Sequence, residues 1–194
     1  MNRYSQVERK TNETDITVKL IINGEGEFSG TSGVGFFDHM LTSFARHGNF
    51  DINLKCTGDL HIDGHHTIED IGIVTGQAFT KACGDFKGIK RFSDVIMPMD
   101  EALTLSAIDI GGRGFLHYDI PLPTLKVGDF DVQLVKEFFL AFTRNFPINL
   151  HLKLFHGENT HHIIESVFKG TAVALRKALK ITNNKIPSSK GKII

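Results

Sequence analysis

The sequence has no tryptophan, only two cysteines and five prolines, and no long apolar run. Lysine plus arginine and aspartate plus glutamate number 22 each among 194 residues, so the formal net charge is zero. This balance argues against a basic surface for nucleic acid or anionic membranes. No apolar stretch approaches the roughly 18 residues of a membrane-spanning helix, and the N-terminal segment does not resemble a signal peptide. Cys56 and Cys83 form no recognisable pattern. We therefore expect a cytoplasmic globular protein with reduced thiols and with neither nucleic acid nor a membrane as partner.

Histidine, in contrast, is abundant, and four of the ten histidines form two adjacent pairs. The segment His65–Glu69 reads HHTIE, and HHIIE follows 96 positions later at His161–Glu165. The same offset aligns the tripeptide INL at 52–54 with INL at 148–150. Repetition of both a polar motif and its surroundings indicates an internal duplication.

The boundaries of the duplication follow from these offsets. We expect a first structural repeat over 1–90 and a second over 91–194, together forming one compact unit. The last twelve residues contain Pro187 and Gly191, and they are predicted to be a mobile C-terminal tail.

Apolar periodicity predicts the same order of elements in both repeats. Alternation of apolar and polar residues predicts strands at 16–22, 50–56, 103–110, 115–120 and 148–155. Helical spacing predicts helices at 36–47, 65–83, 132–144 and 161–181. The strands at 103–110 and 115–120 are expected to pair as a hairpin around the glycine-rich turn 111–114. Each repeat is thus a β-β-α-β-α unit, which predicts an α/β fold of the two-layer (α+β) sandwich type.

The histidine pairs suggest a binuclear metal site. On a helix, His65 and Glu69 share a face, whereas His66 is rotated by about 100° and therefore faces elsewhere. Repeat symmetry predicts that one ion binds His65, Glu69 and His162. The other would bind His161, Glu165 and His66, and the swapped pairing is equally compatible. Imidazole and carboxylate without thiolate suit Mn²⁺, Fe²⁺ or Zn²⁺, and more than four ligands favour octahedral Mn²⁺.

Two further ligands are predicted on the other helix of each repeat. Upstream of the histidine pairs the offset becomes 98, which aligns Arg46 with Arg144. The same offset aligns His39 with Glu137, and both are coordinating residue types. Each ion would then have four protein ligands and open positions for substrate.

Several segments together carry a family resemblance. They are FFDHMLTSFARHGNFD, GDLHIDGHHTIEDIGI, MDEALTLSAIDIGGRG, KVGDFDVQLVKEFF, NTHHIIESVFKG and PSSKG. In order and spacing they resemble imidazoleglycerol-phosphate dehydratase, an enzyme of histidine biosynthesis. The resemblance implies a carbon–oxygen lyase that dehydrates imidazole-glycerol phosphate to imidazole-acetol phosphate. It also implies a duplicated fold like domain 2 of ribosomal protein S5, two Mn²⁺ per active site, and a homo-oligomer of 24 subunits with active sites between chains.

The resemblance assigns roles to individual residues. The metal ligands would be His39, His65, His66, Glu69, Glu137, His161, His162 and Glu165. Contacts to the phosphorylated substrate would include Glu13, Arg91, Arg113, Ser189 and Lys190. Two positions depart from the pattern of many relatives, since Gly64 stands where Asp is common and Glu137 where His is common. Both departures are compatible with function, because glycine can cap a helix and carboxylate suits Mn²⁺.

The implied chemistry explains why such residues are needed. The carbon-bound proton is not adjacent to a carbonyl, so the imidazole ring must accept the electrons. A metal-stabilised imidazolate meets that need, because a metal ion on a ring nitrogen lowers the pKa of the ring N–H. A carboxylate would transfer the proton, and Glu13 and Glu165 both remain candidates. Arg91 and Arg113 would bind the phosphate, and Ser189 and Lys190 in the tail would close over the substrate.

Two other functions remain open from the residues alone. A binuclear metallohydrolase would use similar ligands but would cleave an ester and form no ketone. A metal-storage cage would bind many ions per chain and would need no arginines for a substrate.

Overall fold

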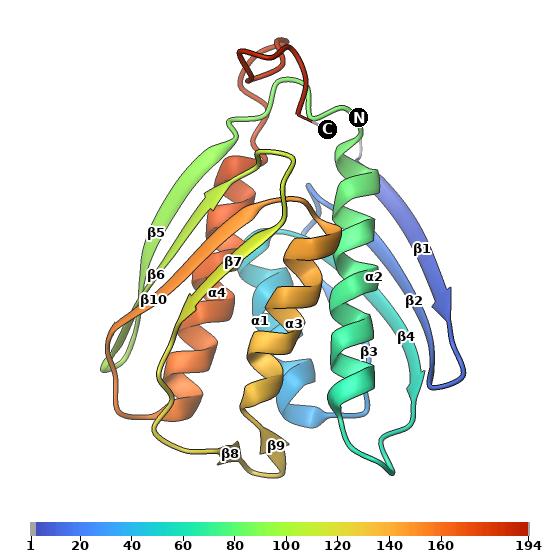
Figure 1. Ribbon diagram of the computed structural model, residues 1–194, viewed down its shortest axis with the longest axis vertical. Helices are drawn as coiled ribbons and strands as arrows, with labels where there is room; N and C mark the ends of the chain where they lie inside the picture. Colours follow the sequence, from blue (N-terminus) through green and yellow to red (C-terminus); the bar gives the residue numbers. More distant parts are fainter. Residues whose placement is uncertain (1–2, 194) are drawn as a thin grey trace.

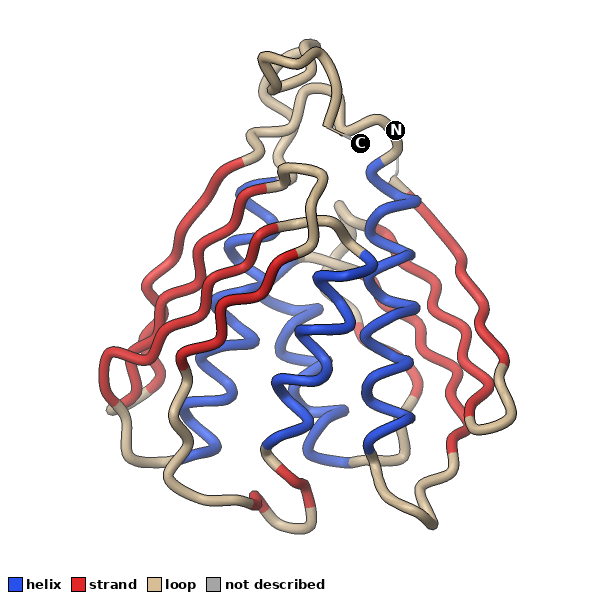
Figure 2. Tube along the Cα trace, in the orientation of Figure 1, coloured by secondary structure: helices blue, strands red, loops and turns tan. Residues whose placement is uncertain are grey.

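The computed structural model describes residues 3–193, and its helices lie between two outer sheets (Figures 1 and 2). The first repeat consists of β1 (Tyr4–Lys10), β2 (Thr14–Ile21), β3 (Phe28–Gly30), α1 (Gly35–Gly48), β4 (Asp51–Gly58) and α2 (His65–Cys83). The second consists of β5 (Phe92–Met99), β6 (Ala102–Asp109), β7 (Phe115–Asp119), β8 (Lys126–Val127), β9 (Phe130–Asp131), α3 (Gln133–Asn145), β10 (Asn149–His156) and α4 (Thr160–Ala178). The predicted α/β class and the duplicated sheet-and-helix unit are confirmed.

The strand arrangement differs from the prediction in two ways. Five strands were not predicted: β1 and the short β3 in the first repeat, and β5, β8 and β9 in the second. The expected hairpin between the strands at 103–110 and 115–120 is wrong. The sheet orders are β1-β2-β4-β3 and β5-β6-β10-β7, so β10 lies between β6 and β7. β7 pairs in parallel with β10, and a parallel neighbour far along the chain leaves no turn signal in the sequence.

The helices of the two repeats pack against each other in crossed pairs. α1 of the first repeat contacts α4 of the second, and α3 of the second contacts α2 of the first. Phenylalanine rings fill the space between them: the Phe37 ring centroid on α1 lies 5.2 Å from that of Phe138 on α3 and 6.2 Å from that of Phe168 on α4. Ten phenylalanines have side chains that are almost wholly buried: Phe37, Phe44, Phe50, Phe79, Phe86, Phe138, Phe139, Phe142, Phe146 and Phe168. The repeats therefore share one core.

The contact between α2 and α3 depends on two glycines of α2. A Cβ atom at Gly72 would lie 2.7 Å from the carbonyl oxygen of Phe138, and one at Gly76 would lie 2.6 Å from that of Phe142. Real Cβ atoms do not approach backbone so closely, so any side chain there would push α3 away from α2.

We predict that Gly76→Ala lowers the free energy of unfolding by about 1–3 kcal/mol, the usual cost of overpacking. Gly35→Ala is the matched control, because a Cβ at Gly35 meets no atom within 4 Å. Denaturant unfolding measures both variants. Equal stability of the two would show that α2 and α3 can separate at little cost.

Within residues 3–193, no helix combines the length and the apolar character needed to cross a membrane. The segment after α4 contacts the body through hydrogen bonds from Gly88 N–H to the Lys185 carbonyl and from Thr182 N–H to the Gly88 carbonyl. The predicted mobility of the tail and the repeat boundaries at 90 and 91 stay predictions.

Candidate active site

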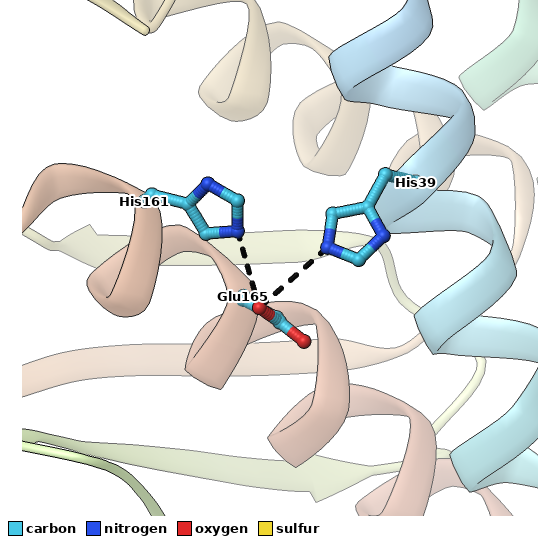
Figure 3. A group of neighbouring side chains, drawn as sticks. All are labelled: His39, His161 and Glu165. Atoms are coloured by element: carbon cyan, nitrogen blue, oxygen red, sulfur yellow. Dashed lines mark hydrogen bonds and ion pairs between the residues drawn. The ribbon is translucent and has the colours of Figure 1, made fainter.

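Three predicted ligands from both repeats meet between α1 and α4 (Figure 3). His39 lies on α1, and His161 and Glu165 lie on α4. The Glu165 Oε2 atom is 3.2 Å from His161 Nε2 and 3.6 Å from His39 Nε2. Within residues 3–193 this is the one trio whose ligand atoms all lie within 4.8 Å of one another. The crossed packing of the helices creates it, because His39 comes from the repeat that does not carry α4.

Local sequence fixes the orientation of the two α4 residues. Asn159 caps the helix, and its Oδ1 accepts from the backbone N–H of His161 at 2.9 Å and of His162 at 3.4 Å. His161 and Glu165 are four residues apart, so they share a helix face. The Phe36 ring on α1 packs edge-on against the His161 ring, with centroids 5.2 Å apart.

Glu165 also contacts a residue that the sequence analysis did not single out. Lys169 Nζ donates to Glu165 Oε1 at 2.8 Å, and the two side chains are 16% and 9% exposed. Burial of Glu165 raises its pKa, but the hydrogen bond from Lys169 and the nearby positive charge outweigh it and hold the pKa below its ordinary value. Glu165 is therefore ionised at neutral pH, the state that a metal ligand requires. The sequence could have predicted this contact, because Lys169 follows Glu165 by four residues and therefore lies on the same helix face.

The first repeat provides a second histidine-rich region at the start of α2. His65 Nε2 lies 3.9 Å from Glu69 Oε2, and His66 Nε2 lies 3.8 Å from Glu13 Oε1. His65 borders a cavity of about 630 Å³ between the starts of α1, α2 and α3. The nearness of Glu13 to His66 agrees with a role for Glu13 beside the predicted site.

His66 and His162 each contact a further carboxylate. Asp59 Oδ2 lies 2.9 Å from His66 Nδ1, and Glu101 Oε2 lies 2.7 Å from His162 Nδ1. These hydrogen bonds lower the pKa of both carboxyl groups and raise the pKa of both histidines. The pKa of Glu101 falls to about 2, because Glu101 accepts from His162 and also from the backbone N–H of Asn159. Asp100 Oδ2 lies 3.6 Å from His162 Nε2. None of these three acidic residues was predicted.

Among residues 3–193, the other predicted ligands do not form a second trio. Glu137 lies on α3 and borders a cavity of about 550 Å³ that also contains Tyr118 and Leu122. α3 packs against α2, which carries His65 and Glu69, just as α1 packs against α4. The predicted grouping of His162 with His65 and Glu69 is not formed within the described part of one chain.

The predicted phosphate contacts gather elsewhere. Arg91, Arg113, Ser189 and Lys190 border one cavity of about 300 Å³. Arg91 is already engaged there, since its guanidinium donates to Asp109 at 2.7 and 3.2 Å and to the Pro187 carbonyl at 2.8 Å. In Figure 1 the tail lies at one end of the molecule, and the histidine-bearing first turns of α2 and α4 lie at the other. Within one chain, the cavity that the predicted phosphate contacts line therefore lies away from the histidine pairs.

The donor set fits a divalent transition metal. Ligand atoms about 2.0–2.2 Å from one ion lie about 3 Å apart when they subtend a right angle. The separations of 3.2 and 3.6 Å around Glu165 Oε2 match this spacing. Two imidazole nitrogens and an ionised carboxylate are ligands suited to Mn²⁺, Fe²⁺ or Zn²⁺.

Comparison with known proteins decides the family. The family model described as imidazoleglycerol-phosphate dehydratase matches residues 32–175. The chain belongs to this family. The enzyme of that name from Caldanaerobacter subterraneus subsp. tengcongensis is 54% identical over 191 residues, covering 97% of this chain and 98% of the relative. The one from Jannaschia sp. is 50% identical over 194 residues, covering 98% of this chain and all of the relative.

Solved structures of the family agree in fold. The imidazoleglycerol-phosphate dehydratase of Staphylococcus aureus superposes with a TM-score of 0.84 at 37% identity, over 92% of this chain and 99% of that one. The Pyrococcus furiosus enzyme, solved in complex with (S)-C348, gives a TM-score of 0.83 at 38% identity, over 96% and 99% of the two chains. The family resemblance stated from the sequence motifs is thus confirmed.

Proposed function

We propose that this protein dehydrates imidazole-glycerol phosphate to imidazole-acetol phosphate in histidine biosynthesis, with two Mn²⁺ ions per active site. The observation that carries the proposal is the trio of His39, His161 and Glu165 in a member of this family. The two Mn²⁺ ions would supply Lewis acidity toward the imidazole ring of the substrate.

The residues of the chain would handle charge and protons around that ring. His39, His161 and Glu165 would hold one ion, and Lys169 would keep Glu165 ionised. His65 and Glu69, with Glu137 on the neighbouring helix, would form the equivalent half of the second set. Glu13 is half exposed beside His66 and is a candidate base for the carbon-bound proton. Glu165 is the other candidate, although its contact with Lys169 favours a fixed, ionised role.

The active site would form between subunits. The phosphate cavity and the histidines lie at opposite ends of one chain, so a substrate spanning both would need a second copy. His66 and His162 lie outside the trio and could complete the metal shell of a neighbour. These two features support a homo-oligomer, and we propose the 24-subunit assembly of the family and a cytoplasmic location.

The deciding experiment incubates the purified, assembled protein with imidazole-glycerol phosphate and Mn²⁺ and follows formation of the ketone by its absorbance as an enolate in alkali. Ketone formation that a chelator abolishes and Mn²⁺ restores is expected. Release of inorganic phosphate without ketone would instead indicate a metallohydrolase and would overturn the proposal.

Arg113→Ala should weaken binding of the phosphorylated substrate with little effect on metal content. Loss of a charge-assisted contact costs about 1.5–3 kcal/mol, which is roughly a 10- to 160-fold rise in KM. Steady-state kinetics measure this rise. Arg176→Ala is the control, because that side chain is exposed and its guanidinium donates to Asn49 Oδ1, away from the predicted phosphate contacts. An unchanged KM in Arg113→Ala would show that Arg113 does not contact the phosphate.

A further inference from the structure

The second histidine of each pair is held at one ring nitrogen by a carboxylate. Asp59 Oδ2 lies 2.9 Å from His66 Nδ1, and Glu101 Oε2 lies 2.7 Å from His162 Nδ1. The opposite nitrogen, Nε2, has no such short contact: its nearest carboxylate is at 3.8 Å in His66 and at 3.6 Å in His162. The two rings therefore have the same pattern of one bonded and one available nitrogen.

The two carboxylates do not correspond to each other in the duplicated sequence. Asp59 lies in the connection between β4 and α2, and the offset of 96 aligns it with Phe155 rather than with an acidic residue. Glu101 lies in the turn between β5 and β6 and corresponds to Glu13, the residue just before β2. Each repeat supplies the carboxylate from a different loop, so the duplication alone does not explain why both histidines have a carboxylate at Nδ1. The shared requirement is the hydrogen bond to Nδ1.

Among the described residues, the side chain of Asp59 forms a hydrogen bond to His66 alone. Its side chain is 11% exposed, and its other oxygen, Oδ1, is enclosed without a hydrogen-bond partner in the structure. An enclosed carboxylate oxygen without a partner is unfavourable, and the hydrogen bond between His66 Nδ1 and the other oxygen offsets part of that cost. Glu101 is shared, because its Oε1 also accepts from the N–H groups of Asn159 at 2.7 Å and Glu158 at 3.2 Å.

We propose that Asp59 and Glu101 are positioning residues that hold His66 and His162 in the Nδ1–H tautomer, so that each ring presents Nε2 to a metal ion. This rests on the proposed metal-dependent function. A carboxylate on the second ring nitrogen fixes the tautomer and the orientation of a histidine ligand and raises its basicity. His65 and His161 are instead oriented toward the glutamate four residues later, so the two members of each pair are positioned by different means.

The test measures Mn²⁺ binding without substrate, so its result does not depend on the dehydration assay. Asp59→Ala should weaken binding at the site that uses His66 by about 10- to 100-fold. Asp59→Asn should lose less, because the amide oxygen can still accept from Nδ1–H. Asp85→Ala is the matched control: it removes an exposed carboxylate that accepts from the Lys87 N–H in the loop after α2, away from both histidine pairs. Its Mn²⁺ affinity should equal that of the wild type.

A second readout reports the tautomer directly. In the metal-free protein labelled with ¹⁵N-histidine, the His66 signals are identified by their loss in His66→Gln. We expect Nδ1 to carry the proton in the wild type and in Asp59→Asn, and the preference to be lost in Asp59→Ala. If Asp59→Ala does not fold, the Mn²⁺ affinity of Asp59→Asn and the His66 tautomer of the wild type still test the proposal. An Nε2–H tautomer in the wild type, or wild-type Mn²⁺ affinity in both Asp59 variants, would overturn the proposal, while ketone formation would still support the enzymatic function.

Discussion

Glu165→Gln should remove about one Mn²⁺ ion per chain and lower kcat by on the order of 10²–10⁴. The glutamate oxygen Oε2 is the atom that both His39 and His161 face, so the amide leaves two imidazoles without their charged partner. Metal Lewis acidity contributes several kcal/mol to catalysis, and each 1.36 kcal/mol is tenfold in rate. Metal analysis of the purified variant and steady-state kinetics measure the two effects.

Loss of stability must be separated from loss of metal in this variant. Glu165→Gln leaves the ammonium of Lys169 largely buried without its carboxylate, which can cost several kcal/mol. The double variant Glu165→Gln/Lys169→Met removes that charge as well, and the neighbouring Met99 sulfur, 3.3 Å from Lys169 Nζ, indicates that an apolar side chain fits there. The double variant should recover thermal stability but not metal. Full metal content in either variant would exclude Glu165 from the site.

Glu137→Ala should lose metal and turnover to a similar extent, whereas Glu137→His should retain both. Glu137 occupies on α3 the place that His39 occupies on α1, and each of these helices packs against the α2 or α4 helix of the other repeat. Imidazole and carboxylate are both suitable for Mn²⁺, so the exchange keeps a ligand at the position.

The alternative for Glu137 is a solvated carboxylate on a helix surface. In that case Glu137→Ala should change stability by no more than about 0.5 kcal/mol and leave bound manganese unchanged. Lys136→Ala, one residue earlier on an exposed part of α3, is the control for helix effects. Manganese per chain in the alanine variant decides between the two interpretations.

The helices were predictable because each has a strong apolar face. The predicted range 65–83 coincides with α2, and 36–47 differs from α1 by one residue at each end. β1 was not predicted because it is an edge strand in which Ser5 is the one fully buried residue, so it has no apolar alternation. β5 has exposed Phe92 and Ile96 and contains Pro98, which obscured its pattern.

The candidate site was predictable where spacing along one helix defines it. His161 and Glu165 form a contact because four residues make about one helical turn. His39 was proposed as a coordinating residue on the other helix, and repeat symmetry then paired it with Glu137. Asp59, Glu101 and Lys169 were not found. The two loop carboxylates occupy unequal positions in the repeats, so neither spacing nor symmetry indicates them. The contacts of Asp59 and Glu101 with the histidines depend on the three-dimensional positions of the two loops.

The crossed pairing of helices has a consequence for the origin of the chain. Because His39 meets the HHxxE helix of the other repeat, a polypeptide of one repeat could not build this trio by itself. Two identical copies exchanging their first helices would build it twice, with His39 of each copy beside the histidine pair of the other. The present chain has the architecture of such a symmetric dimer joined by gene fusion, after which the two halves were free to diverge. His39 and Glu137 differ at matching helix positions, and His66 and His162 contact carboxylates from different loops. Differences of this kind between the halves can persist only in a fused molecule that is no longer symmetric.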